Sequence, residues 1–134
     1  SGADYYEFDA RGDTRLGQAA LFKETLVEYG ARVGRQDTKA QLPLEIVPAE
    51  AGSNSFVLTF DGKPLPKTEV TVFGPPKWLK QFHTDEAGKF TIETPWTGQY
   101  VLEAAHAQDK TGDHGGKPYT KVRYVTTLTF DRSK

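Results

Sequence analysis

Residues 55–62 read SFVLTFDG, and this stretch decides the fold class. Phe56, Leu58 and Phe60 alternate with smaller or more polar residues, which is the period of two expected for a strand with one buried face. Asp61-Gly62 follows directly and favours a tight turn, because glycine accepts the positive φ angle that other residues avoid. The stretch therefore predicts a half-buried β-strand that ends in a hairpin.

The same alternation extends from Leu42 to Phe130, with turn residues about every eight to twelve positions, as in an all-β sandwich or barrel. Gly88 in TDEAGKF (84–90) is expected to take the left-handed conformation of a bulged hairpin. His83 is expected to face outward. Further inward-facing side chains are expected at Leu42, Leu44, Ile46, Val70, Val72, Trp78, Phe82, Phe90, Ile92, Tyr100, Leu102, Ala104, His106, Val122, Tyr124, Thr126, Leu128 and Phe130.

The segment ALFKETLVEYGARV (20–33) fits two periods. Helical spacing is present at Phe22, Leu26, Tyr29 and Val33. The alternation of Thr25, Val27 and Tyr29 instead favours a strand. We favour the strand because every later element is a strand, and the helix remains the alternative.

Residues 1–18 are polar, and we expect them to form an extended or poorly ordered arm, with the β-sandwich domain spanning residues 19–134. The chain begins with Ser1-Gly2 and contains no methionine, so we expect a processed or partial chain.

Composition limits the classes of function. The 134 residues suit one domain with a sizeable core. With no cysteine, the chain has no disulfide, thiolate metal site or cysteine nucleophile. The formal charge of −1 does not favour binding to nucleic acid or to an anionic membrane. No apolar run approaches the length of a membrane span, so direct membrane insertion is not expected.

Five motifs in a fixed order give a more specific indication: PLEIVP (43–48), DGKPL (61–65), TDEAGKF (84–90), GQYVLEAAH (98–106) and TTLTF (126–130). In this series the chain, over roughly residues 20–130, resembles a bacterial periplasmic family of unknown function related to the NikM-type component of nickel and cobalt uptake. The TDxxGxF pattern alone is weak, because many prealbumin-like sandwich domains carry it. The ordered series is much more specific.

The resemblance implies an immunoglobulin-like (prealbumin-like) β-sandwich, and we expect about seven or eight strands. It also implies a periplasmic location and a membrane uptake receptor or transporter subunit as partner. It implies no catalytic residue. We therefore expect a non-enzymatic binding or accessory domain associated with transition-metal uptake. The alternatives are a protein-interaction module with no ligand of its own and a carbohydrate-binding sandwich.

Residues 105–119, AHAQDKTGDHGGKPY, contain the candidate metal ligands. His106 and His114 are suitable ligands for nickel, cobalt, copper or zinc, and Asp109 and Asp113 could complete the shell. His83 joins them if its strand neighbours the strand that holds His106. The alternative to a metal site is an ordinary solvated loop, because the spacing of these histidines and aspartates matches no compact metal motif. In both cases we expect a long connection between the last two strands, with His114 near its tip.

Trp96, beside the turn at Thr97-Gly98, is the candidate interaction residue, since an exposed aromatic side chain could bind a partner or stack on a sugar. Catalysis is not expected. Three histidines and many threonines are present, but none lies in a recognisable nucleophile setting.

Overall fold

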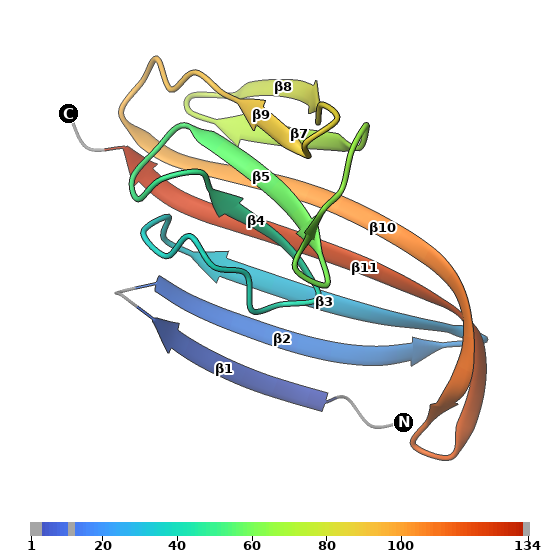
Figure 1. Cartoon of the computed structure of the whole chain (residues 1–134). Coiled ribbons are helices and arrows are strands. Elements are labelled where there is room, and N and C mark those ends of the chain that lie inside the picture. The colour runs from blue at the N-terminus through green and yellow to red at the C-terminus, as the bar shows by residue number, and fades with distance from the viewer. Residues whose placement is uncertain (1–3, 11–12, 133–134) are drawn as a thin grey trace.

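The computed structural model describes the backbone of residues 4–10 and 13–132, and the side chains of residues 13–132. Within this part of the chain, eleven β-strands and no helix form two sheets that pack as a sandwich (Figure 1). The predicted all-β sandwich is confirmed, although the strands outnumber the seven or eight expected. The described residues include no helix that is long and apolar enough to cross a membrane.

The seven-stranded sheet is the larger layer, and all but one of its neighbouring pairs are antiparallel. The exception is the parallel pair of β3 and β11 near the centre of the sheet. The strands, in their order across the sheet, are β1 (Asp4–Ala10), β2 (Asp13–Phe22), β3 (Thr25–Val33), β11 (Lys117–Arg132), β10 (Gly98–His114), β7 (Glu69–Gly74) and β8 (Trp78–His83).

The four-stranded sheet is the smaller layer and is built around β5 (Ser55–Phe60). One edge of β5 pairs with β4 (Leu44–Pro48). Its other edge pairs with β6 (Lys63–Pro64) and β9 (Lys89–Thr91), which bond to opposite ends of β5. Since the smaller layer covers one side only, that side of the seven-stranded sheet is here called its inner face, and the opposite side its outer face (Figure 1).

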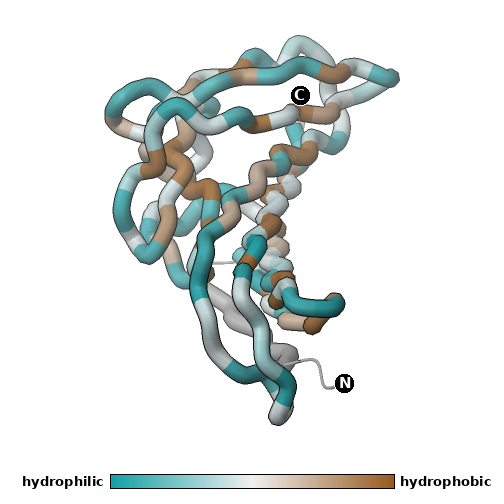
Figure 2. Tube along the Cα trace, turned by 90° about the vertical axis from the view of Figure 1, so that its right-hand side faces the viewer, coloured by the Kyte–Doolittle hydropathy of each residue, from teal (hydrophilic) through white to brown (hydrophobic). Residues whose placement is uncertain are grey.

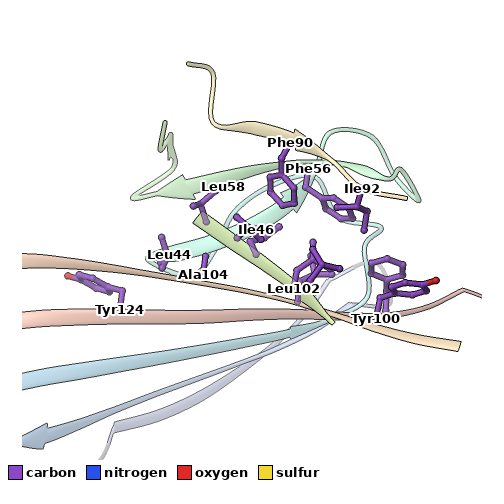
Figure 3. Packing of buried hydrophobic residues seen from close by; sticks show 14 of the residues in the cluster. Leu44, Ile46, Phe56, Leu58, Phe90, Ile92, Tyr100, Leu102, Ala104 and Tyr124 are labelled. Atoms are coloured by element: carbon purple, nitrogen blue, oxygen red, sulfur yellow. The ribbon is translucent and has the colours of Figure 1, made fainter. Parts of the chain in front are cut away.

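The apolar core fills the space between the two sheets (Figure 3). Phe56 and Leu58 of the opening stretch are fully buried there, as the alternation predicts, while Phe60 packs at the margin of the core. The buried residues of the core are Ala19, Leu26, Leu44, Ile46, Phe56, Leu58, Val70, Val72, Phe90, Ile92, Tyr100, Leu102, Ala104, Val122, Tyr124, Leu128 and Phe130.

Two tight turns agree with the sequence. Asp61 and Gly62 both have positive φ angles, 52° and 79°, which matches the twist of the β5–β6 hairpin. Gly88 has a φ of 72°, as predicted. The Asp85 carboxylate accepts hydrogen bonds from the backbone N–H groups of Ala87 and Lys89, and this closes the turn before β9.

The amino-terminal region is more ordered than expected. Residues 4–10 form β1, and residues 13–22 form β2, so the boundary expected at residue 19 falls inside a strand of the seven-stranded sheet. Residues 25–33 form β3, which confirms the strand rather than the helix in this segment.

The prediction of a long loop between the last two strands is wrong. β10 and β11 stay paired as far as His114 and Lys117, and the two-residue turn Gly115-Gly116 joins them with φ angles of 62° and 83°. A bulge between Asp109 and Gly112 interrupts the register. The result is a mostly hydrophilic two-stranded ribbon that extends away from the two sheets (Figure 2).

Candidate functional site

The candidate histidines lie in separate places. The His106 ring lies 4.8 Å from the ring of Phe60, centroid to centroid, at the margin of the core. His114 is the last residue of β10 and is paired with Lys117 at the end of the ribbon. His83 is exposed at the end of β8, which is separated from β10 by β7. The structure therefore does not place the strand of His83 beside the strand of His106.

The two candidate aspartates also follow the ribbon. Asp109 pairs with Lys121 just before the bulge, and Asp113 pairs with Pro118 near the tip. Across the described ranges, no three histidine or carboxylate side chains gather in a way that could hold a metal ion. The metal role of these five residues stays a prediction.

His106 belongs to a small aromatic group. The Phe60 ring packs against both His106 and Tyr124, which are paired neighbours on β10 and β11, with a centroid distance of 4.9 Å to the Tyr124 ring. Burial raises the pKa of the Tyr124 hydroxyl, and the nearby carboxylates of Glu28 and Asp61 add to this rise. These contacts give His106 a packing role at the end of the core.

Trp96 is 41% exposed. Its ring packs edge-on against Trp78 at 5.9 Å, and Trp78 packs against Tyr100. The Tyr100 hydroxyl donates to the Trp96 carbonyl (2.8 Å) and accepts from the Trp96 N–H (3.0 Å). Gly74 allows this arrangement, because a Cβ atom there would lie 2.6 Å from the Tyr100 ring. Trp96 is thus an exposed aromatic residue whose backbone is fixed.

A buried network of five charged residues was not predicted. Arg15, Arg32 and Glu45 are at most 1% exposed. The second carboxylate oxygen of Glu45 accepts from Arg15 Nε at 2.7 Å and from Arg32 Nη1 at 2.8 Å. Its first oxygen accepts from the backbone N–H groups of Gln41 and Leu42, at 2.7 and 2.8 Å. The Glu45 carboxylate is therefore bonded on both oxygens.

Asp13 and Asp37 complete this network. Asp13 Oδ2 accepts from Arg32 Nη2 at 2.6 Å and from the backbone N–H groups of Gln36 and Asp37. Arg32 also donates to the Asp37 carbonyl, and the Asp37 carboxylate lies 3.4 Å from Arg15 Nη2. The network therefore ties β2, β3 and β4 to the segment between residues 34 and 43. It lies away from solvent, so its role is to hold the sheets and this segment in register.

The outer face of the seven-stranded sheet is the second feature that was not predicted. β2, β3, β11 and β10 present outward side chains in five cross-strand rows. From the first row to the fifth these are Thr14, Val33, Thr129 and Val101; Leu16, Ala31, Thr127 and Glu103; Gln18, Tyr29, Val125 and Ala105; Ala20, Val27, Arg123 and Ala107; and Phe22, Thr25, Lys121 and Asp109.

The part of the outer face formed by β2 and β3 is poor in charge. None of the ten outward positions on β2 and β3 is charged, although 26% of the residues of the chain are. Large apolar side chains are exposed there: Phe22, Tyr29 and Val33 are 55%, 45% and 56% exposed. An antiparallel sheet face that meets water usually alternates polar residues outward. The composition of the β2 and β3 part of this face is therefore closer to that of a buried surface.

A shallow hollow of about 260 Å³ lies in the middle of the outer face. Its walls come from β2, β3 and β11, and they are mainly apolar. The side chains around it belong to the second and third rows: Leu16, Gln18, Tyr29, Ala31, Val125 and Thr127. The hollow results from the small Ala31 side chain between larger neighbours.

Comparison with known families gives one match. A family model described as Domain of unknown function (DUF4198) matches residues 6–108, which is more than half of the chain. No curated protein and no solved structure matches the chain. The match covers β2 to β9 and most of the apolar core.

Proposed function

The chain belongs to the DUF4198 family of domains of unknown function, and we propose that it is a non-enzymatic accessory domain that acts by binding another protein chain through the outer face of its seven-stranded sheet. In the setting that the sequence resemblance implies, this domain is periplasmic and serves a transition-metal uptake system.

The composition of the outer face carries this proposal. Phe22, Tyr29 and Val33 expose apolar surface on strands whose outward positions are all uncharged. Contiguous exposed apolar surface of this kind marks protein interaction sites in soluble proteins. Burying it against a partner would gain roughly 25 cal/mol for each Å² of apolar area removed from water.

The proposal that this domain serves a transition-metal uptake system has different support. It comes from the ordered motifs between PLEIVP (43–48) and TTLTF (126–130), which resemble the family related to NikM-type components. In the fold these motifs form β4, the β5–β6 turn with β6, the Gly88 turn, and parts of β10 and β11. Of these, β4, β10 and β11 contribute buried side chains to the core. The partner class implied by the resemblance is a membrane receptor or transporter subunit.

The proposal is tested by site-specific photocrosslinking in cells. A benzoylphenylalanine residue in place of Tyr29 lies at the centre of the outer face and keeps an aromatic side chain there. The matched control places the same residue at Glu86, whose side chain is 83% exposed in the turn before β9. We expect discrete protein adducts from position 29 and none from position 86.

Absence of adducts at position 29, or the same adducts from both positions, would contradict the proposal. Mass spectrometry of the adduct then identifies the partner. A subunit of a metal-uptake system, found with or without a second copy of this chain, would support the proposed setting. Adducts only to other proteins unrelated to uptake would contradict that setting while leaving the binding role intact.

A further inference from the structure

We propose that the partner on the outer face is a second copy of this chain, docked face to face about a two-fold axis that runs along the third row. This inference rests on the proposed function, because it names the occupant of the same surface. Two sheets that pack face to face keep their strands roughly aligned, as this axis allows. A two-fold axis also gives the closed, isologous interface that is commonest among protein dimers.

The axis determines which rows meet. The third row faces its own counterpart, the second row faces the fourth row of the other copy, and the first row faces the fifth. Tyr29 therefore meets Tyr29 of the second copy at the centre, where each ring is 45% exposed in the single chain. Pairs of aromatic rings stabilise interfaces by about 0.5–1.5 kcal/mol beyond the area that they bury.

Side-chain sizes match under this operation. In the second and fourth rows, Leu16 meets Ala20 of the second copy, and the reverse contact follows by symmetry. Ala31, at the floor of the hollow, likewise meets the larger Val27. On β2 and β3, large side chains of the second and fourth rows thus face small ones, which lets the two copies interdigitate there at the packing density of a protein interior.

The charges of the outer face also match. Asp109 and Lys121 occupy directly opposite positions in the fifth row of one chain, so these two opposite charges already lie beside each other within the copy. Glu103 and Arg123 remain, in the second and fourth rows. Four residues of strand separate these rows, or about 13 Å, so the two side chains do not form an ion pair within one chain. Neither has an ion-pair partner among the described side chains.

The two-fold axis brings these charges together between copies. Glu103 faces Ala107 of the second copy, and the cross-strand neighbour of Ala107 is Arg123. Neighbouring strands lie about 4.8 Å apart, which is within reach of an arginine side chain. Two symmetric Glu103–Arg123 pairs would therefore form. An axis parallel to the strands would instead place Glu103 opposite the apolar positions of β2.

The area of the face is sufficient for a stable dimer. Four strands about 4.8 Å apart and five rows about 6.7 Å apart span roughly 650 Å² on each copy. The total of about 1,300 Å² lies within the 1,200–2,000 Å² range of specific protein interfaces.

The test is a charge exchange between copies, followed by light scattering after size-exclusion chromatography. The wild-type chain is expected at twice the 14.9 kDa mass of one copy. Glu103→Arg places two arginines together, and Arg123→Glu places two glutamates together, so each variant alone is expected to associate at least tenfold more weakly. An equal mixture of the two variants restores both pairs and is expected to associate again.

Restored association in the mixture also shows that both variants fold. The matched controls Glu93→Arg and Lys89→Glu exchange charges on exposed residues at β9, away from the outer face, and are expected to remain dimeric. A monomeric wild-type chain, dimeric single variants or a mixture that stays monomeric would each overturn the inference. A monomeric chain that still crosslinks to a different protein through position 29 would overturn this inference and leave the proposed function standing.

Discussion

The buried interior of this molecule has two halves of opposite chemistry. Above β10, β11 and β7 it is filled with stacked aromatic and aliphatic side chains; the rings of Phe56, Phe90, Phe130 and Tyr100 form a continuous series with centroid distances between 5.6 and 6.0 Å. Around Asp13 and Arg15 at the start of β2 and Arg32 near the end of β3 it is filled with the buried network around Glu45. Farther along the same strands, Ala19 and Leu26 belong to the apolar core. β4 contributes to both halves, since Ile46 lies in the core and Glu45 in the network.

The two halves hold the sheets together in different ways. Apolar burial is roughly proportional to area and has little directional preference, so a core adapts to changes of shape that keep its volume. A buried ionic network depends on geometry, because each charge taken out of water must keep its partners. The ionic half therefore fixes how β4 and the segment after β3 dock, and the apolar half supplies most of the driving force for folding.

The largest expected effect comes from Glu45→Gln, which keeps the shape of the side chain and removes its charge. Both arginines would then be buried without their shared carboxylate, and the amide NH₂ group would meet donors instead of accepting from them. We expect a loss of about 3–5 kcal/mol in the free energy of unfolding, measured by guanidinium denaturation. The exposed control Glu50→Gln should change it by less than about 0.5 kcal/mol. A loss of similar size in both variants would contradict the role of the network.

Gly88→Ala should have the next largest effect, because it disturbs the turn that leads into Phe90. A Cβ atom at residue 88 would lie 2.9 Å from the Leu65 backbone nitrogen and 3.0 Å from the Leu58 oxygen. Gly62→Ala is the matched control, since residue 62 also has a positive φ but a Cβ atom there would meet no other atom within 4 Å. Thermal or chemical unfolding should show a loss of about 2–3 kcal/mol for residue 88 and about 1 kcal/mol for residue 62. Equal losses would mean that the φ angle alone matters at both turns.

Phe56→Leu tests how well the apolar half adapts. Phe56 is fully buried and stacks on Phe90 and Phe130, so the change removes two ring contacts but leaves an apolar side chain. We expect a loss of about 1–2 kcal/mol in chemical denaturation, well below that of Glu45→Gln. A loss equal to that of Glu45→Gln would remove the contrast between the two halves.

This contrast also explains which elements could be predicted. From Leu42 onward, apolar side chains face the core, so the period of two is visible in the sequence. In β2 the inward positions include Asp13 and Arg15, which are buried by pairing with other charges. Alternation by polarity fails for such a strand, and this is why residues 1–18 resemble a polar arm in the sequence. Pairing partners far along the chain, such as Glu45 for Arg15, leave no local signal.

Two further features could not be predicted from the sequence, for related reasons. The ribbon from Asp109 to Lys121 has no buried residue, so its strands lack apolar alternation, and only the Gly115-Gly116 turn marked the hairpin. The outer face could not be recognised because the parallel pairing of β3 with β11 joins segments about a hundred residues apart, and without it the rows are unknown. Among the candidate residues, the exposed position of His83 was predicted from the inward-facing Trp78 and Phe82 on the same strand.

The smallest expected effect is a pH dependence contributed by Asp37, at the edge of the ionic half. Burial alone would raise the pKa of its carboxyl group, but the hydrogen bond from the Lys39 N–H and the positive charge of Arg15 more than offset this, so the pKa is lower than in an unfolded chain. A carboxyl group with a lowered pKa stabilises the fold above its unfolded pKa of about 3.9, and this contribution is lost as the pH falls through the folded value. Asp37→Asn should therefore cost about 1 kcal/mol at pH 6, and the difference from wild type should shrink as the pH falls from about 4 to 2.5. Denaturation curves of both proteins across this range measure the difference directly. If it stays constant with pH, the charge of Asp37 does not contribute to the network, and its role is limited to the hydrogen bonds of its backbone groups.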